Sequence, residues 1–352
     1  MQAFTFNALP GRIVFGPGRS TELADEARRL NLRQILVLST PNQRLLAEAI
    51  AQQLGTLAVG VHAEAVMHVP DTVATAATER ARSLAADGIV AIGGGSTIGL
   101  GKAIALATGL PVIAIPTTYA GSEMTPIWGI TRNGIKTTGR DARVLPKTVI
   151  YDAELTLQLP AAISATSGLN AIAHCVEGLY SQDANPVASL MAAEGIRALA
   201  QALPVIVAQP HDADARSLAL YGAWLSGTVL GMVGMALHHK LCHTLGGSFN
   251  LPHAEVHTVM IPQVAAFNSA AAPEAMARIA AALGSAQAAS GLYDLVVRLQ
   301  APHSLSALGM REQDLDKAAD LATRNPYYNP RAVTRDNVRD LLQAAYEGKR
   351  PA

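Results

Sequence analysis

The sequence predicts an α/β fold joined to an all-helical part, with a first domain over residues 1–158 and a second over residues 159–352. Two observations predict this division. Short apolar runs alternate with helical periodicity as far as Asp152, which is the pattern of βαβ units with a parallel sheet. Beyond Asp152 strand-like runs nearly vanish, alanine-rich helical periodicity continues, and Leu159-Pro160 marks the boundary. A chain of 352 residues is long enough for two such domains.

The elements of the first domain follow from that alternation. The expected strands are the apolar runs at Arg12–Phe15, Gln34–Ser39, Ala58–His62, Gly88–Ile92 and Pro111–Ile115. The expected helices lie between them, at Thr21–Leu30, Gln43–Leu54, Thr72–Ala86 and Thr97–Thr108. Because ligands of two-domain proteins bind preferentially between the domains, we expect the functional site in a cleft between these two.

The composition argues against several classes of protein. Hydrophobic residues make up 50% of the chain and charged residues 15%, so a large core is available and disorder is not expected. Lys plus Arg and Asp plus Glu each number 27, which argues against nucleic acid or an anionic membrane as the main partner. The partner that we expect is a small molecule.

Targeting signals are not evident. The N-terminus does not have the basic start and apolar stretch of a secretory signal. The most apolar stretch, from Leu218 to Leu237, is interrupted by glycines and predicts a buried helix. The two cysteines, Cys175 and Cys242, do not suggest a disulfide scaffold. We therefore expect a cytoplasmic protein.

A glycine-rich turn after the fourth expected strand predicts a site for a nucleotide phosphate. The turn consists of Gly93, Gly94, Gly95 and Ser96 and leads directly into a helix. Glycines let backbone N–H groups approach a pyrophosphate closely, and the helix N-terminus adds a favourable dipole. An ordinary strand-to-helix connection is the alternative, but three consecutive glycines followed by serine favour phosphate binding. The turn matches neither GxGxxG nor the Walker A motif.

Two further loops are expected to complete a cofactor site. The segment Pro116–Thr125 follows the next strand and carries three hydroxyl side chains, those of Thr117, Thr118 and Ser122. They stand at the carboxyl end of a parallel sheet, where ligands of α/β folds bind. The residues after the second strand are neutral and polar, namely Ser39, Thr40 and Asn42. Since an acidic residue there would repel a 2′-phosphate, its absence predicts that both NADH and NADPH are accepted.

Six histidines gather in short segments of the second domain. They are His174, His238, His239, His243, His253 and His257. Asn170 and His174 are four residues apart, and so are His239 and His243, so a helix places each pair on one face. A lone histidine in an apolar helix is usually a hydrogen-bonded core residue, but this many favour a functional site. His238 and His257 are the two for which a structural role fits best.

The histidines could hold a metal ion or act without one. Three imidazoles and the carboxamide of Asn170 make a weak metal site, because zinc and iron usually gain from an anionic ligand. The other use is electrostatic, since imidazoles donate hydrogen bonds to an oxyanion or carboxylate and transfer protons near neutral pH. The chemistry of these residues favours the second use modestly, so no metal is expected.

With these residues assembled, the chain resembles the iron-containing alcohol dehydrogenase superfamily over nearly its full length, and within it most closely the maleylacetate reductases. The resemblance rests on shared segments and residues, namely Gly93–Ser96, Pro116–Thr125, His174, His239, His243, His253 and Asn329-Pro330-Arg331. It implies a Rossmann-like N-terminal domain, a helical C-terminal domain as in dehydroquinate synthase-like folds, and a homodimer.

Two departures from the superfamily pattern bear on the reaction. Metal-dependent members carry an aspartate at the position of Asn170, and members that use alcohols carry another at the position of Gly99. For a dianionic dicarboxylate, the loss of both carboxylates removes a repulsion of roughly a few kcal/mol in a low-dielectric cleft. The metal-independent maleylacetate reductases look like this. The resemblance therefore implies reduction of the carbon–carbon double bond of maleylacetate to 3-oxoadipate by NADH or NADPH in the degradation of aromatic compounds.

The resemblance also implies roles for the histidines. His243 and His253 would donate hydrogen bonds to the oxyanion of an enolate. His174, His239 and His243 are candidates for delivering the proton. Asn170 would then line the substrate site in place of holding a metal.

The substrate carboxylates need partners of their own. The candidates are Arg331, Arg324, Lys136, Lys240, Tyr327 and Tyr328, of which we single out Arg331, Lys136 and Tyr328. Arg331 comes first because a guanidinium binds a carboxylate bidentately. Two other functions stay open, a metal-dependent alcohol or polyol dehydrogenase of the same fold and a catalytically silent nucleotide-binding protein.

Overall fold

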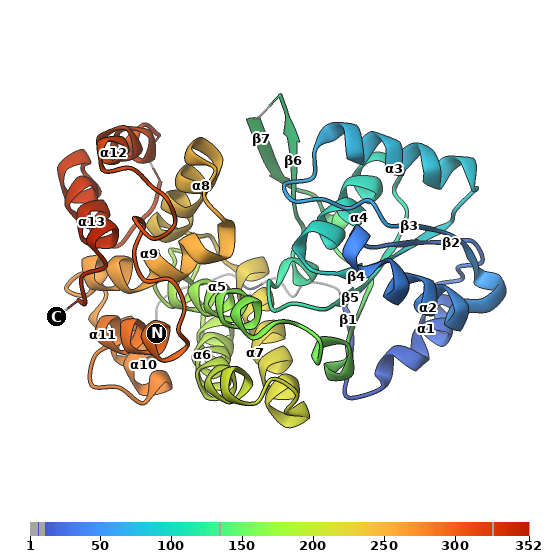
Figure 1. Ribbon diagram of the computed structural model, residues 1–352, viewed down its shortest axis with the longest axis horizontal. Helices are drawn as coiled ribbons and strands as arrows, with labels where there is room; N and C mark the ends of the chain where they lie inside the picture. Colours follow the sequence, from blue (N-terminus) through green and yellow to red (C-terminus); the bar gives the residue numbers. More distant parts are fainter. Residues whose placement is uncertain (1–5, 7–10, 134, 326, 352) are drawn as a thin grey trace. The chain divides into compact units, whose positions relative to one another are not determined.

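The computed structural model describes residue 6 and residues 11–133, 135–325 and 327–351. Within them the chain divides into two compact units, with the boundary between Leu159 and Pro160. The predicted boundary lies between residues 158 and 159. The first unit is α/β and the second is helical, which confirms the predicted fold class (Figure 1).

A six-stranded parallel sheet forms the centre of the first unit. Its strands lie in the order β1 (Arg12–Phe15), β8 (Thr148–Tyr151), β5 (Val112–Pro116), β4 (Gly88–Gly93), β2 (Ile35–Leu38) and β3 (Ala58–His62). Strands β2, β4 and β5 are buried along their whole length, which explains their continuous apolar sequences. The sequence predicted five of the six strands and missed β8, which pairs with β1 and β5.

Helices cover both faces of this sheet. They are α1 (Leu23–Arg29), α2 (Arg44–Leu54), α3 (Asp71–Ser83) and α4 (Gly95–Thr108). Val90 and Ile92 of β4 share an apolar cluster with α1 and α2, whereas Ile89 and Ala91 face Gly101 of α4. Strands β2 and β4 are neighbours in the sheet. The chain continues from β2 to β3 at one edge of the sheet, and from β4 to β5 in the opposite direction. Ligands of such sheets bind at the carboxyl ends of the strands where the order reverses in this way.

A hairpin that the sequence did not predict extends the first unit. Strands β6 (Ile127–Arg132) and β7 (Ile135–Arg140) pair antiparallel, apart from the main sheet. Lys136, Thr137 and Thr138 on β7 are exposed, so the strand does not show the apolar run that marks a buried one. Short 3-10 helices connect the other elements at Arg19–Glu22, Pro41–Gln43, Gly55–Leu57, Ser122–Met124, Ala142–Val144, Ala153–Thr156 and Glu312–Asp314.

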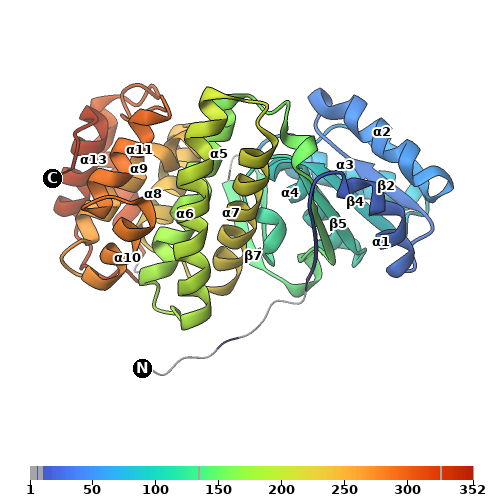
Figure 2. The ribbon, with the colours of Figure 1, turned by 90° about the horizontal axis from the view of Figure 1, so that it is seen from below.

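The second unit is built from helices around the buried helix α5. Its helices are α5 (Ala161–Tyr180), α6 (Pro186–Ala208), α7 (Ala213–Met232), α8 (Leu237–Phe249), α9 (His253–Asn268), α10 (Pro273–Leu283), α11 (Ala288–Arg298), α12 (Leu315–Thr323) and α13 (Arg335–Glu347). Helix α5 is buried at every position from Ser164 to Tyr180 and lies beside α6 and α7 (Figure 2). Gly178 permits this approach, because a Cβ there would collide with Val229 of α7.

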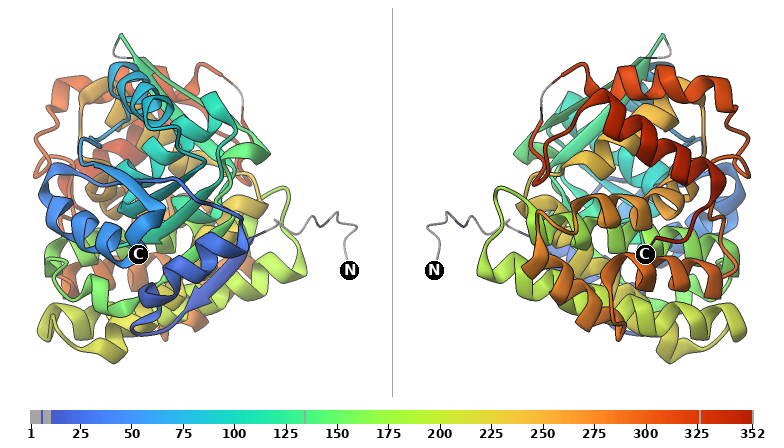
Figure 3. Two further views of the ribbon diagram at one scale, coloured as in Figure 1. Left: turned by 90° about the vertical axis from the view of Figure 1, so that its right-hand side faces the viewer. Right: turned by 90° about the vertical axis from the view of Figure 1, so that its left-hand side faces the viewer.

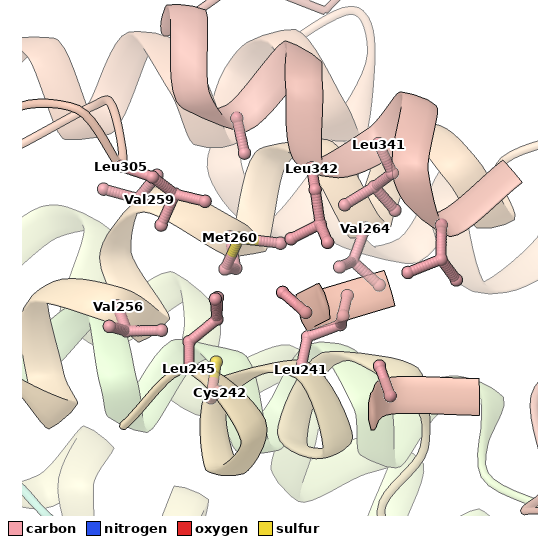
Figure 4. Close-up of a cluster of buried hydrophobic side chains, with 14 of the residues drawn as sticks. Leu241, Cys242, Leu245, Val256, Val259, Met260, Val264, Leu305, Leu341 and Leu342 are labelled. Atoms are coloured by element: carbon pink, nitrogen blue, oxygen red, sulfur yellow. The ribbon is translucent and has the colours of Figure 1, made fainter. Parts of the chain in front are cut away.

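A second apolar core lies among α8, α9, α12 and α13. Leu241 and Cys242 of α8, Met260 of α9 and Leu342 of α13 belong to it (Figure 4). Helices α12 and α13 pack side by side at the C-terminal end of the unit (Figure 3). This core fixes α8 against α9, and these two helices carry five of the six histidines that the sequence analysis singled out.

Among the described residues, α6 is long and apolar enough to cross a membrane by itself, and α7 with α8 passes only as a pair bent by 97°. Core helices of soluble proteins pass the same test. Helix α6 packs against both α5 and α7 inside the helical unit, which is how a core helix behaves. The apolar stretch from Leu218 to Leu237 forms α7 as far as Met232 and then turns, so it is a buried helix as predicted.

Candidate active site

The glycine-rich turn after β4 leads directly into α4. Gly93 has a φ of 150°, a conformation that residues with a side chain rarely adopt. A Cβ at Gly94 would lie only 2.9 Å from Cγ2 of Thr118, so glycine allows the loops after β4 and β5 to touch. The turn ends at the N-terminus of α4, where the first backbone N–H groups have no partner within the helix. The structure thus provides the geometry of an anion site at the predicted position.

The loop after β2 joins the other two. Gln43 Nε2 donates to Thr117 Oγ1 at 2.9 Å, and a Cβ at Gly93 would lie 3.0 Å from Gln43 Oε1. The three loops therefore converge where the strand order reverses. The predicted residues after β2 differ in exposure, with Ser39 buried, Thr40 half-buried and Asn42 exposed. The sequence analysis missed Gln43, because a lone glutamine has no motif and its partner lies far away in the chain.

Lys102 on α4 holds the loop after β5 from inside the unit. Its side chain is fully buried, and Nζ donates to Ser122 O at 2.6 Å, to Ile127 O at 2.8 Å and to Thr125 Oγ1 at 2.9 Å. Burial lowers the pKa of Lys102 to about 7, and the nearby Glu123 opposes this shift. Contacts to this many acceptors favour the ammonium form. Ser122, predicted to contact the cofactor, is therefore fixed in place by Lys102.

Gly99 on α4 lies under a strained segment. His68 and Val69 both have positive φ angles, 67° and 46°, and a β-branched residue rarely adopts this conformation. Thr131 of the hairpin holds both residues, because its N–H donates to Val69 O at 3.0 Å and its Oγ1 to His68 O at 2.8 Å. A Cβ at Gly99 would lie 2.9 Å from Val69 Cγ2. Val69 therefore occupies the space that a side chain at Gly99 would need.

The six histidines come together in the helical unit, from α5, α8 and α9. The ring centroids of His174 and His239 are 5.1 Å apart, and those of His239 and His257 are 4.9 Å apart. The ring of His253 lies 4.5 Å from that of His257 and stacks with His243 at 6.2 Å. The histidines that the four-residue spacing singled out in the sequence therefore form one continuous cluster in the structure.

The cluster has a buried side and a solvent-facing side. His174 and His239 are 3% and 7% exposed, whereas His253 is half-buried and His243 is exposed. Burial lowers the pKa of His174 well below its ordinary value, and the other histidines add to the shift. Burial does the same to His257, whose pKa is also well below its ordinary value. These two rings are therefore neutral at neutral pH, and a ligand from solvent meets His243 and His253 first.

Glu177, one turn after His174 on α5, is a buried carboxylate that the sequence analysis missed. Its Oε1 accepts from the N–H of His238 at 2.8 Å, and its Oε2 lies 2.5 Å from His239 Nδ1. Burial alone would raise the pKa of Glu177, but the charge of His239 and the hydrogen bond to it lower the pKa overall. Glu177 is thus an anion at the N-terminus of α8, and its contact with His239 uses Nδ1 and not Nε2 of that ring.

The residues at the position of a family metal site do not fit a metal well. Asn170 is 5% exposed, and its Oδ1 has no hydrogen-bond partner among the described residues. Together with His174, His239 and His253 it gives a donor set without charge, while Glu177 uses its oxygens on α8 and His239. Iron and zinc usually gain from an anionic ligand, and the amide oxygen of Asn170 is a poorer donor than a carboxylate. A buried carbonyl oxygen without a partner instead suits a hydrogen bond from a donor such as a water molecule.

The structure does not bring Arg331 to the histidines. Its guanidinium stacks over the ring of Phe267 at 4.2 Å and donates to Phe267 O at 3.1 Å, beside a hollow of about 200 Å³. Phe267 and His253 stand near opposite ends of α9, about 21 Å apart at a rise of 1.5 Å per residue. Arg331 is therefore not part of the candidate site. Lys136 is exposed on β7 of the first unit and Tyr328 is 39% exposed, and their roles stay predictions.

Comparisons with known families match both halves of the chain. A family model described as iron-containing alcohol dehydrogenase matches residues 10–153, and its C-terminal counterpart matches residues 164–346. A maleylacetate reductase of Burkholderia cepacia is 59% identical over 352 residues, which covers 100% of both chains.

Solved structures agree with these matches. The crystal structure of maleylacetate reductase from Agrobacterium tumefaciens superimposes with a TM-score of 0.97 at 59% identity and covers 100% of both chains. A sulfoacetaldehyde reductase from Bifidobacterium kashiwanohense, crystallised with NAD+, gives a TM-score of 0.90 at 25% identity. That comparison covers 98% of this chain and 99% of the other.

Substitution of Gly99→Asp tests the contact with Val69. We expect the free energy of unfolding to fall by roughly 1–3 kcal/mol, because the new Cβ overlaps a strained and buried side chain. Replacing a glycine by aspartate inside a helix would otherwise stabilise the helix by roughly 0.3 kcal/mol. Urea unfolding of the variant gives the difference.

The double variant Gly99→Asp with Val69→Ala should recover most of that loss, because it removes the overlapping methyl group. Gly95→Ala is the matched control, since a Cβ there would meet Ala120 at an ordinary 3.9 Å. A Gly99→Asp variant as stable as the native chain would show that Val69 does not exclude a side chain at this position.

Proposed function

The chain belongs to the iron-containing alcohol dehydrogenase family, and we propose that it reduces the carbon–carbon double bond of maleylacetate to 3-oxoadipate with NADH or NADPH. We further propose that it does so without a metal, in the degradation of aromatic compounds. Relatives at 59% identity over the whole chain are named maleylacetate reductases. The observation that carries the metal-free proposal is the buried, uncharged Asn170 within the histidine cluster.

An anionic substrate suits the charges of this cluster. Asn170 presents a neutral amide, and the nearby carboxylate of Glu177 is already engaged with α8 and His239. A substrate carboxylate close to an ionised group at Asn170 would experience repulsion of about 4 kcal/mol at 4 Å and an effective dielectric constant of 20. Imidazole N–H groups offer hydrogen bonds in place of this repulsion.

The protein's part in the reaction is to stabilise charge and deliver a proton. When bound, the reduced nicotinamide supplies a hydride to the alkene carbon that is β to the ketone. His243 and His253, at the solvent-facing side of the cluster, then donate hydrogen bonds to the enolate oxygen that forms on the substrate. Their stacked rings, with planes 15° apart, keep the two donors side by side before the substrate binds. Such preorganised donors favour the charged state over the ketone.

Among the candidates for the proton donor, His239 is supported best. Burial lowers the pKa of His174 well below its ordinary value, so at neutral pH its ring is neutral and is a poor acid. The contact of Glu177 Oε2 with His239 Nδ1 orients the ring of His239 and leaves Nε2 as its nitrogen for proton transfer. We assign His239 the delivery of a proton to the second alkene carbon.

The cofactor would bind to the three converging loops of the α/β unit. The N–H groups of Gly93–Ser96 at the start of α4 suit the pyrophosphate. Thr117, Thr118 and Ser122 line the neighbouring loop. The neutral residues after β2 would admit either NADH or NADPH. A relative with the same fold was crystallised with NAD+. A homodimer and a cytoplasmic location remain predictions.

A direct assay tests the proposed function. The purified chain should oxidise NADH and NADPH when maleylacetate is added, with 3-oxoadipate identified as the product by mass spectrometry. A chelator should leave the rate unchanged, and elemental analysis should find less than one metal ion per active chain.

Stoichiometric iron or zinc, with activity lost to chelator and restored by metal, would instead identify a metal-dependent alcohol or polyol dehydrogenase. Tight binding of NAD(P)H with no turnover of maleylacetate or related enoates would favour a catalytically silent nucleotide-binding protein.

The variant Asn170→Asp tests the electrostatic role of Asn170. We expect KM for maleylacetate to rise at least about tenfold, which corresponds to roughly 1.4 kcal/mol of added repulsion. The variant should also bind zinc more tightly, because it supplies the missing anionic ligand. Asn170→Ala is the uncharged control and should raise KM less. Full maleylacetate activity in the aspartate variant would show that Asn170 is not the determinant.

The variant Glu177→Gln tests the pairing of Glu177 with His239. We expect kcat to fall roughly 10–100-fold, the range seen when an orienting partner of a functional histidine is lost. KM for maleylacetate should change much less, because Glu177 itself does not face the substrate. Glu177→Asp keeps the charge and should recover part of kcat. Equal losses in both variants would show that the carboxylate serves only to hold α8.

The pH dependence of stability gives a second measurement on Glu177. Its pKa is below the ordinary 4.5 in the folded chain, so its charge stabilises the fold above pH 4.5. This contribution is lost as the pH falls through the lower folded value. The Gln variant should therefore unfold more easily than the native chain at pH 7, and the difference should shrink in acid.

A further inference from the structure

A histidine–cysteine–histidine group lies behind the histidines proposed for catalysis. Cys242 follows His238 by one turn on α8, and His257 faces both from α9. His238 Nε2 lies 2.8 Å from His257 Nδ1 and 3.6 Å from Cys242 Sγ. The three ligand atoms all lie within 4.8 Å of one another, and none of the side chains is more than 1% exposed. The proposed reaction uses none of the three.

The hydrogen bonding of this group is incomplete. His238 Nδ1 and His257 Nε2 are buried, and neither has a hydrogen-bond partner within the described part of the chain. Each imidazole carries at least one N–H, and only one N–H can lie between two ring nitrogens that stand 2.8 Å apart. The other is a buried donor without a partner, at a cost of roughly 1–3 kcal/mol.

We propose that His238, Cys242 and His257 form a binding site for a soft or borderline divalent cation of the zinc and cadmium class. Two nitrogens and one sulfur without a carboxylate suit such a cation and not Mg²⁺ or Ca²⁺. The ligands would be His238 Nε2, His257 Nδ1 and the thiolate of Cys242. The two nitrogens must separate from 2.8 Å to roughly 3.3 Å to share a tetrahedral ion at about 2.0–2.1 Å from each.

The proton balance of binding follows from these atoms. The Cys242 thiol releases its proton to solvent as the metal–sulfur bond forms. The proton between the rings moves to the outer nitrogen of its own ring, which is His238 Nδ1 or His257 Nε2. Both inner nitrogens then offer lone pairs to the cation. One proton is therefore released per ion bound, and affinity rises with pH.

Occupation of this site would disturb the catalytic cluster. The ring of His257 lies 4.9 Å from that of His239 and 4.5 Å from that of His253. His238 directly precedes His239 on α8. Separating His238 from His257 must shift these neighbours, so the cation inhibits the reaction. The inhibition rests on the proposed function, whereas the binding does not.

Titration of the metal-free chain with Cd²⁺ tests the proposal. We expect an ultraviolet sulfur-to-cadmium charge-transfer band that saturates at one ion per chain, with loss of NADH oxidation in parallel. Cys242→Ala should abolish the band, protect the activity, and weaken binding by more than the roughly 10–100-fold typical of outer-shell changes. Cys175→Ala is the matched control, because this buried thiol lies 3.1 Å from Ser226 Oγ on α7 and should not contribute to the band.

Several outcomes would overturn the assignment. They are the absence of a band after prolonged incubation, a band that survives Cys242→Ala, and loss of activity without a band, which would put the cation on other histidines. If Cys242→Ala does not fold, as judged by circular dichroism, His257→Gln gives the same test through a different ligand. A band in a chain that does not reduce maleylacetate would refute the proposed function and leave the metal site standing.

Discussion

The hydrogen bonds of Glu177 are the constraint on which the histidine cluster depends. A carboxylate with no solvent exposure is costly unless it is paired and hydrogen-bonded. Glu177 meets this requirement with the backbone N–H of His238 and the ring of His239. The same contacts fix the first turn of α8 against α5. They also engage Nδ1 of His239, so that Nε2 is its nitrogen for contact with a substrate in the proposed reaction. One buried charge thus determines both a helix position and the chemistry of a side chain.

The α/β unit uses the opposite charge in the same way. Lys102 is as deeply buried as Glu177 and donates to the carbonyl oxygens of Ser122 and Ile127. Glu177 accepts from backbone N–H groups, and Lys102 donates to backbone carbonyl groups. In both cases backbone groups and a side chain together satisfy the charge, and the buried residue ties the segment that supplies them to a helix. Each unit therefore holds its functional segment by a buried ion, because helix and strand packing alone does not determine where a loop lies.

The sequence predicted what local pattern determines. Continuous apolar runs gave β2, β4 and β5, and the spacing of four residues placed His239 and His243 on one face of α8. Features that depend on distant partners were missed. The hydrogen bond of Gln43 to Thr117 joins loops that are far apart in the chain, and the hairpin of β6 and β7 has exposed, polar residues. Arg331 was assigned by its charge, whereas its stacking on Phe267 appears only in three dimensions.

The two carboxylates missing from the family pattern have separate physical causes. At Gly99 the cause is space, because the strained Val69 lies where a Cβ would stand. At Asn170 a side chain of nearly the same size as aspartate is present, so the difference lies in charge and hydrogen bonding. The hydrogen bond from the N–H of Thr131 to Val69 O holds Val69 in place, and this contact does not depend on a bound substrate. The electrostatic argument for a dianionic substrate therefore rests on Asn170. At Gly99 the absence of a carboxylate is explained by the space that Val69 occupies.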